Sequence, residues 1–293
     1  MTKTIIATGA SSGIGFEAIK QLLAQNVQRY KFILGVRDVA AAQAAYDVLD
    51  FDKARLVDIL PLELSDMNGV KMFAGKVLEM LGDGQSLNYL MLNAARTHPA
   101  DGPGPNGSKW CETYIVNHLS QHYLVHLLRP KLVESSSRLV FVSSGAVRVV
   151  KDTNSLTSIL KANSGADGKV VYPASKLAAL FSTHWWRRTL AGKCTVVAVS
   201  PGLIPDTGIA RGLGGSMDLP PEIMKDAKSP AVGGASVLAA FTRSDFPEDP
   251  DRIFLTSWGE WWGSDMIANS LDKELQNEWS PSKEDIEREE GVV

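Results

Sequence analysis

The sequence predicts a doubly wound α/β fold on a seven-stranded parallel sheet, within a single domain. Short strand-like runs alternate with helical patterns along almost the whole chain. The strand-like runs are apolar at most positions, as in sheets that helices cover on both faces. A chain of 293 residues is long enough to bury a large core around such a sheet.

The elements are expected in strict alternation. The expected strands are Thr4–Thr8, Phe32–Val36, Leu56–Leu62, Tyr89–Asn93, Arg138–Ser143, Thr195–Ser200 and Ile253–Thr256. The expected helices are Ile14–Ala24, Val39–Leu49, Met67–Met80, Cys111–Val133, Tyr172–Leu190 and Ala231–Phe241. Right-handed crossovers through these helices place them on both faces of the sheet.

Three segments depart from this alternation. Residues 151–169 are rich in Ser, Asn, Gly and Asp and are expected to form a loop insertion. Residues 203–229 carry many Gly and Pro residues and are expected to form a mobile flap beside the site. The domain is expected to span 1–271, and the charged segment 272–293 is expected to be a solvated tail or a frayed helix.

Composition and charge exclude several classes of protein. A net charge of −3, without a basic stripe, predicts no binding to nucleic acid. No apolar run is long enough to cross a bilayer, and the first strand begins too early to leave room for a signal sequence. Cys111 and Cys194 fit neither a disulfide framework nor a metal site. A cytoplasmic protein with a small-molecule substrate is therefore expected.

A glycine-rich turn follows the first strand and leads into the first helix. Glycines permit positive φ angles and close backbone approach, and the free N–H groups at a helix start bind anions. The turn predicts a phosphate site, although glycine-rich turns are also common in proteins for other reasons, so the turn alone is weak evidence. Its residues are Thr8-Gly9-Ala10-Ser11-Ser12-Gly13-Ile14-Gly15.

Tyr172 and Lys176 begin a later expected helix and share one of its faces. A phenol ordinarily titrates near pH 10, too high for proton exchange at neutral pH. A neighbouring ammonium group would lower that pKa. Taken alone, the pair is commonplace, and an ordinary surface Tyr beside a Lys is the favoured interpretation.

Further polar motifs stand where other strands end, at the edge where open α/β sheets bind ligands. Ser143-Ser144 closes the fifth expected strand, and Pro201-Gly202 closes the sixth. Asn93-Ala94-Ala95 closes the fourth, and Asn117 lies in the helix after it. Their common position predicts one active site along this edge.

With these motifs the sequence resembles the short-chain dehydrogenase/reductase family over about residues 3–260, and leans towards its retinol-dehydrogenase-like and protochlorophyllide-reductase-like branches. The resemblance implies a Rossmann fold and a catalytic set of Asn117, Ser144, Tyr172 and Lys176. Ser144 is preferred to Ser143 because the second serine is catalytic in similar sequences. Tyr172 would donate a proton to a substrate carbonyl oxygen that Ser144 also contacts, and Asn117 would position a water molecule. Lys176 would bind the nicotinamide ribose and lower the Tyr172 pKa.

The resemblance also implies a nicotinamide cofactor, and the end of the second strand favours NADP(H). Val36 stands where NAD-specific members carry an acid, and the next residue, Arg37, suits a 2′-phosphate. Asp38 is interpreted as the N-cap of the following helix. The family commonly has Thr where this chain has Asp206, with Thr207 next. Expected cofactor contacts are Gly9, Ser11, Ser12, Gly13, Ile14, Gly15, Arg37, Glu63, Leu64, Asn93, Ala94, Tyr172, Lys176, Pro201, Gly202, Ile204 and Thr207.

Two other clusters invite a functional interpretation. His118, His122 and His126 share one helix face, but no carboxylate joins them, so packing is favoured over a metal site. Trp261 and Trp262 are interpreted as core or interface residues, with cover of the substrate mouth as the alternative.

The predicted activity is NADP(H)-dependent reduction of a carbonyl, or oxidation of the alcohol, on a small apolar molecule, such as a compound of secondary metabolism. Ala146, Val147, segment 151–169 and segment 203–229 are expected to shape the substrate pocket. Reduction of a C=C or C=N bond remains an alternative, as does a non-redox NADP(H)-binding cyclase or regulator. Both a monomer and a homo-oligomer fit the sequence.

Overall fold

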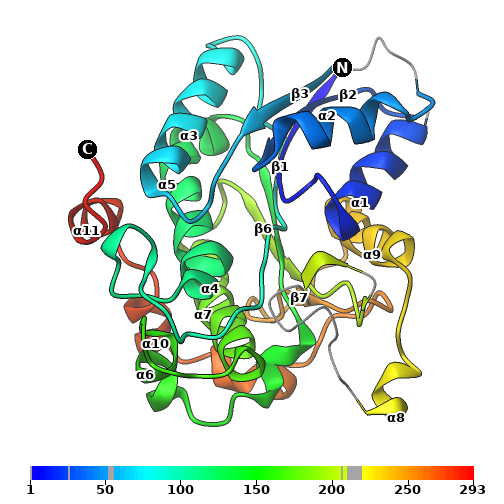
Figure 1. Ribbon diagram of the computed structural model, residues 1–293. Helices are drawn as coiled ribbons and strands as arrows, with labels where there is room; N and C mark the ends of the chain where they lie inside the picture. The colour runs from blue at the N-terminus through cyan, green and yellow to red at the C-terminus, as the bar shows by residue number, and fades with distance from the viewer. Residues whose placement is uncertain (1, 26, 52–55, 206, 210–219) are drawn as a thin grey trace.

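A computed structural model describes residues 2–25, 27–51, 56–205, 207–209 and 220–293. Within these residues one parallel sheet has the strand order β3-β2-β1-β4-β5-β6-β7. The chain winds outward in both directions from the β1–β4 pair, which confirms the predicted doubly wound fold (Figure 1). The strands are β1 (Lys3–Thr8), β2 (Tyr30–Val36), β3 (Leu56–Pro61), β4 (Tyr89–Leu92), β5 (Arg138–Val142), β6 (Thr195–Val199) and β7 (Phe254–Leu255).

Helices cover both faces of the sheet (Figure 1). On one face lie α1 (Gly13–Ala24), α2 (Val39–Asp47) and α9 (Pro230–Thr242). On the other lie α3 (Met67–Leu81), α4 (Glu112–Tyr114), α5 (Ser120–Glu134), α6 (Leu156–Leu160) and α7 (Gly168–Thr189). The remaining helices are α8 (Pro221–Met224), α10 (Lys273–Glu278), α11 (Lys283–Glu289) and the short η1 (Pro105–Gly107), η2 (Ile115–Leu119), η3 (Gly145–Val149), η4 (Thr153–Ser155) and η6 (Ser264–Ser270).

The alternation of strand side chains explains the two cores. Ile5 and Ala7 of β1 face the layer of α1, α2 and α9, whereas Ile6 faces the layer of α3, α5 and α7. All three side chains are fully buried. The strands are therefore apolar at most positions, as the sequence predicted.

The expected helix 111–133 is interrupted by one π-helical turn, η2. Such a turn widens the helix and frees carbonyl groups from the regular ladder. Here the Ser120 hydroxyl donates to the Ile115 carbonyl at 2.9 Å, and Gln121 Nε2 donates to the Val116 carbonyl at 3.1 Å. These bonds stabilise the turn, which contains Asn117.

Segment 151–169 is more ordered than the expected loop insertion, because it contains η4, α6 and the first residues of α7. Leu156 and Leu160, one helical turn apart, are fully buried. Lys161 forms an isolated antiparallel bridge with Trp110. The polar composition of the segment gave no sign that Leu156 and Leu160 would be buried.

The expectation of a solvated tail or frayed helix at 272–293 is wrong. This segment forms α10 and α11, and Trp279 and Ile286 are 4% and 2% exposed. The charged side chains of this segment are exposed or half-buried, and its apolar side chains pack against the core of α4, α5 and α7. None of the helices described in Figure 1 has the length and apolarity needed to cross a membrane.

Candidate active site

The glycine-rich turn lies between β1 and α1, where it contacts the end of β4. Gly9 has a φ of 66°, and a Cβ there would lie 2.7 Å from the Ala94 Cα. A Cβ on Gly15 would lie 2.4 Å from the Gly9 carbonyl oxygen. Both positions therefore require glycine, because Gly9 lies against the backbone of Ala94 and Gly15 lies against the turn itself.

The side chains of Thr8 and Asn93 hold this turn against β4. The backbone N–H groups of Asn93 and Ala94 donate to the Thr8 hydroxyl at 3.0 and 3.1 Å. Asn93 Nδ2 donates to the Gly9 carbonyl at 2.9 Å. Asn93, expected to contact the cofactor, thus uses its amide to shape the turn.

The first turn of α1 has the features of an anion site. Ser12 is the N-cap but makes no side-chain cap bond, which leaves the first N–H groups of the helix without that partner. Gly13 has a φ of 58°, and a Cβ there would lie 3.4 Å from Thr207 Cβ. The structure therefore brings Thr207 of segment 203–229 to the glycine turn, whereas Asp206 and residues 210–219 lie outside the described residues.

The end of β2 carries an exposed cation without a counter-charge. Val36 is 2% exposed, and Arg37 is exposed and forms no ion pair or hydrogen bond within the described part of the chain. Asp38 accepts a bond from the Ala41 N–H at 2.9 Å, which confirms its interpretation as an N-cap. The Asp38 carboxylate is therefore engaged in capping α2.

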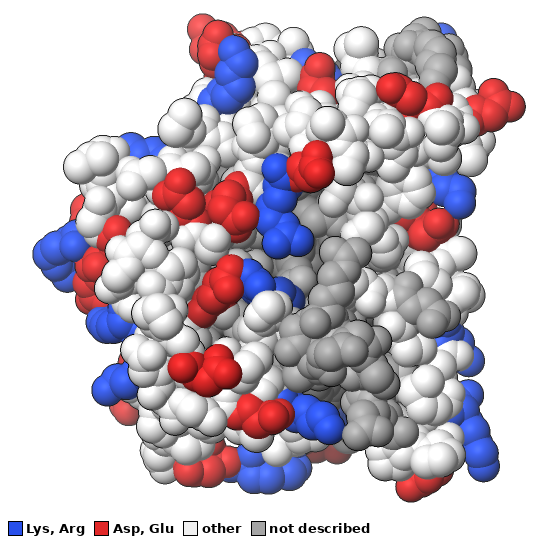
Figure 2. Space-filling view, viewed as in Figure 1, with Lys and Arg blue, Asp and Glu red and all other residues white. Residues whose placement is uncertain are grey.

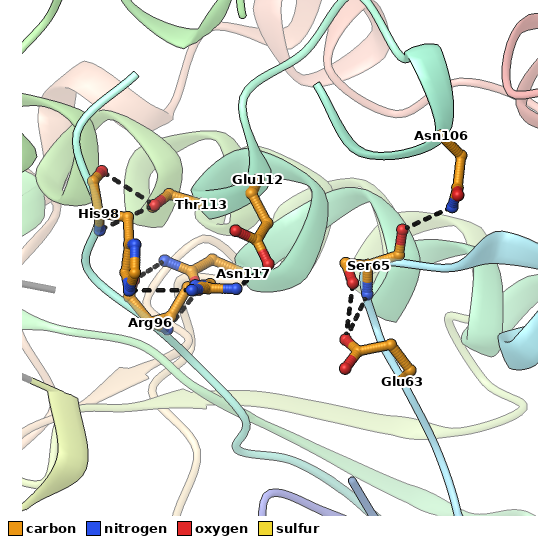
Figure 3. A network of polar contacts seen from close by, with 8 residues as sticks. All are labelled: Glu63, Ser65, Arg96, His98, Asn106, Glu112, Thr113 and Asn117. Carbon is orange, nitrogen blue, oxygen red and sulfur yellow. Dashed lines mark hydrogen bonds and ion pairs between the residues drawn. The ribbon is translucent and has the colours of Figure 1, made fainter. Parts of the chain in front are cut away.

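The end of β3 holds the expected contacts Glu63 and Leu64. Glu63 accepts bonds from the N–H and hydroxyl of Ser65 at 2.9 and 2.8 Å (Figure 3). Leu64 is 5% exposed and packs in the core, which leaves its backbone rather than its side chain for a ligand.

Arg96 is a site residue that the sequence analysis missed. It follows Asn93-Ala94-Ala95 directly, and its side chain pairs with Glu112 and lies 2.9 Å from His98 Nε2 (Figure 3). Burial and the charge of Arg37 lower the pKa of Arg96, so the two guanidinium groups lie on the same side of the site. The available signal was a charged residue directly after the polar motif Asn93-Ala94-Ala95 that follows β4.

Asn117 joins the loop after β4 to α7. Its amide accepts a bond from the Arg96 N–H at 2.8 Å and donates to the Arg96 carbonyl at 2.9 Å. The same amide nitrogen donates to the Ser175 hydroxyl at 2.9 Å, and that hydroxyl donates to the Tyr172 carbonyl at 2.7 Å. The loop and the helix of Tyr172 are thus fixed relative to each other.

The structure brings Ser144, Tyr172 and Lys176 together. Lys176 is 3% exposed, and its Nζ donates to the Val142 carbonyl at 2.8 Å and lies 5.9 Å from the centre of the Tyr172 ring. The Ser144 side chain lies close enough to Tyr172 to lower the pKa of its phenol, and the Ser144 hydroxyl accepts a bond from the Ala146 N–H at 3.1 Å. The buried hydroxyl of Ser143 has no partner among the described residues.

The pKa shifts at this site differ from the expectation. Burial raises the pKa of Tyr172, and the Ser144 side chain opposes that rise. Burial lowers the pKa of Lys176 to about 8. Desolvation disfavours both charged forms, and in this geometry it outweighs any lowering of the Tyr172 pKa by the ammonium.

The expected pocket residues are only partly placed at the site. Val147 is fully buried, and its carbonyl accepts a bond from Asn269 Nδ2 at 2.9 Å. Trp262 lies beside the residue after Ser144, since a Cβ on Gly145 would be 3.5 Å from its ring. The Arg148 guanidinium stacks over the Trp262 ring at 4.8 Å. Arg148 and Trp262, rather than Val147, border the site.

The three histidines, His118 of η2 and His122 and His126 of α5, make packing contacts. His118 Nε2 lies 2.6 Å from the Ser182 hydroxyl, and His122 Nδ1 accepts a bond from Trp186 Nε1 at 2.9 Å. His122 and His126 both lie within hydrogen-bond distance of the Pro281 carbonyl, at 2.9 and 3.2 Å. These contacts attach the C-terminal segment to α5.

Comparisons with known proteins agree with this architecture. The family model described as short chain dehydrogenase matches residues 3–216. A short-chain dehydrogenase/reductase of Pestalotiopsis microspora is 54% identical over 97% of this chain and 98% of its own length. Human retinol dehydrogenase 11 is 32% identical over 69% of this chain and 61% of its own length.

Solved structures show the same fold at lower identity. The NADPH-bound carbonyl reductase from chicken fatty liver is 22% identical, with a TM-score of 0.66 over 89% of this chain and 98% of that one. Members of the short-chain dehydrogenase/reductase family are oxidoreductases that bind a nicotinamide cofactor. By the extent of the family match and the identity to its relatives, this chain belongs to the short-chain dehydrogenase/reductase family.

Proposed function

We propose that the protein is an NADP(H)-dependent reductase of a carbonyl group on a small apolar molecule, with Tyr172 as the general acid. The observation that carries this proposal is the proximity of Tyr172 to the buried Lys176, whose ammonium lies 5.9 Å from the centre of the Tyr172 ring, with the Ser144 side chain close enough to influence the Tyr172 pKa. Two hydroxyl groups this close together could both donate to a single substrate oxygen.

The glycine turn fits a dinucleotide. Gly9 and Gly15 keep the backbone compact, Gly13 has a positive φ, and the first N–H groups of α1 lack a side-chain cap. The pyrophosphate of the cofactor would lie there, beside Thr207. When bound, the nicotinamide supplies or accepts the hydride.

The preference for NADP(H) rests on Arg37. This guanidinium is exposed and unpaired among the described residues, and Asp38 is engaged as an N-cap. A 2′-phosphate would provide the missing counter-charge. Several structural neighbours were solved with NADPH or a form of NADP bound, including the chicken carbonyl reductase.

The protonation of Tyr172 suits reduction of a carbonyl, the direction that the preference for NADP(H) favours. Burial keeps its phenol protonated at neutral pH, as a proton donor to a carbonyl oxygen must be. Ser144 would hydrogen-bond the same oxygen, and the Lys176 ammonium would stabilise the phenolate left after proton transfer. Asn117 acts as a positioning residue through its bonds to Arg96 and Ser175.

The direct test is NADPH oxidation over a panel of ketones, aldehydes, an enone and an imine, with product analysis. Tyr172→Phe should lower kcat by about 100-fold or more while NADPH still binds. Tyr30→Phe, at the far end of β2, is the matched control and should retain full turnover.

The outcomes separate the alternatives. Undiminished turnover by Tyr172→Phe would refute the assigned acid. A saturated C=C or C=N product with the carbonyl intact would favour the alternative reductase. Tight NADPH binding without turnover of any compound would favour a regulator or a non-redox enzyme.

A further inference from the structure

A cavity of about 240 Å³ lies between α4, α6 and the C-terminal helices α10 and α11. In Figure 1 these elements gather on one side of the molecule, and residues 272–293 form one wall of the cavity. The residues that line it do not include any of the four expected catalytic residues. The C-terminal wall also lies beyond residues 3–216, which the family model matches.

Three aromatic side chains form the inner part of the cavity. The Trp110 and Tyr114 rings lie 4.8 Å apart, and the Trp279 ring lies 5.9 Å from Trp110 and 5.6 Å from Tyr114. Their planes are tilted by 43°, 50° and 74°, so they do not stack in parallel. Ring faces carry a negative potential that attracts cations.

Four carboxylates line the outer part. Asp285 pairs with Arg288, and Glu289 pairs with Lys109 at 2.6 Å. The other two, Glu278 and Glu290, form no ion pair within the described ranges. The cavity therefore has an excess of negative charge.

Glu290 is the more buried of these two unpaired carboxylates. It accepts one bond from the Ser108 hydroxyl at 3.1 Å. Burial, together with the neighbouring charge of Glu289, raises the pKa of Glu290. A cation in the cavity would relieve both effects.

Tyr114 presents an unsatisfied hydroxyl to the same space. The residue is 3% exposed and lines the cavity, yet its hydroxyl makes no hydrogen bond within the described part of the chain. Burial raises the pKa of Tyr114, and the nearby charges of Glu290, Glu289 and Glu278 raise it further. This hydroxyl is not among the buried polar atoms without a partner, so the cavity gives access to its oxygen.

We propose that this cavity binds a small organic cation, an ammonium group attached to an apolar body. The apolar body would lie against Trp110 and Trp279, the ammonium would face Glu290 and Glu278, and one N–H would donate to the Tyr114 oxygen. An anion would be repelled by the carboxylates, and a neutral apolar compound would leave them unpaired.

The test uses benzylamine as the probe and benzyl alcohol as its neutral counterpart, measured by calorimetry on the full-length protein near pH 7. Benzylamine should bind at least about tenfold more tightly than benzyl alcohol. Glu290→Gln and Tyr114→Phe should each weaken benzylamine at least about fivefold, because each change removes one partner of the ammonium.

Two controls keep the result specific. Glu79→Gln removes an exposed carboxylate of α3, outside the cavity, and should leave benzylamine affinity unchanged. Melting temperature and NADPH binding verify that both cavity variants remain folded. Equal affinities for the amine and the alcohol, no saturable binding of the amine, or undiminished binding by folded Glu290→Gln would each overturn the proposal.

Discussion

Acidification should destabilise this protein through its buried histidines, and His184 offers the sharpest test. Burial lowers the pKa of His118 and of His184 to about 3, and they are 2% and 1% exposed. Their Nδ1 atoms have no partner among the described residues. In the unfolded chain an imidazole titrates near pH 6.5.

The magnitude follows from proton linkage. Between pH 7 and pH 5 the unfolded imidazole gains a proton and the folded one does not, so the unfolding free energy falls as pH falls. Each fully buried histidine contributes a loss of about 2 kcal/mol over this interval, or about 4 kcal/mol for His118 and His184 together. The pKa of His122 is also lowered by burial, which acts in the same direction.

Urea unfolding, followed by tryptophan fluorescence at pH 7 and pH 5, measures this loss. His184→Gln cannot gain the proton, so its loss between the two pH values should be about 2 kcal/mol smaller, whatever its stability at pH 7. Lys76→Gln, exposed on α3, is the control and should behave as the parent protein. An identical pH dependence in His184→Gln and the parent would refute a buried neutral imidazole.

Three further predictions concern the active site. Arg37→Ala should weaken NADPH about tenfold or more, because one charge-assisted bond to the 2′-phosphate is lost, and should leave NADH almost unchanged. Equal losses for both cofactors, or the same loss in the exposed control Arg129→Ala, would contradict the assignment. Gly15→Ala should cost about 1–3 kcal/mol and most cofactor affinity, since its Cβ would lie 2.4 Å from a backbone oxygen. Gly75→Ala, whose Cβ would meet nothing within 4 Å, should be neutral or stabilising. The kcat/KM for NADPH should fall as pH rises through about 8, where free Lys176 loses its proton. Lys176→Arg keeps its charge, so the same fall in that variant would assign the titration to another group.

Much of the fold was predictable because its signals are local. The strand positions follow from apolar runs between turns, and the parallel order follows from the helix between each pair of strands. Gly9 and Gly15 were recognisable from their spacing between a strand and a helix, and their contacts explain why glycine is required there. Their pattern predicted a phosphate site, and the motifs at the other strand ends strengthened that prediction.

Long-range packing decided what local patterns could not. The charges of 272–293 indicated a solvated tail, but Trp279 and Ile286 find apolar partners on helices distant in sequence. Those partners are invisible to composition or periodicity. The same packing created the cavity around Tyr114.

The chemical identities at the active site were determined by the sequence, through residue types at the ends of successive strands. Only the tertiary structure decided their electrostatic state. Desolvation depends on everything that surrounds a group, and here it raises the pKa of Tyr172 and lowers that of Lys176. The effect of the Arg37 charge on the pKa of Arg96 and the position of Trp262 beside Gly145 likewise depend on how strand ends meet in space. Sequence determined which groups are present, and packing determined their charge and their neighbours.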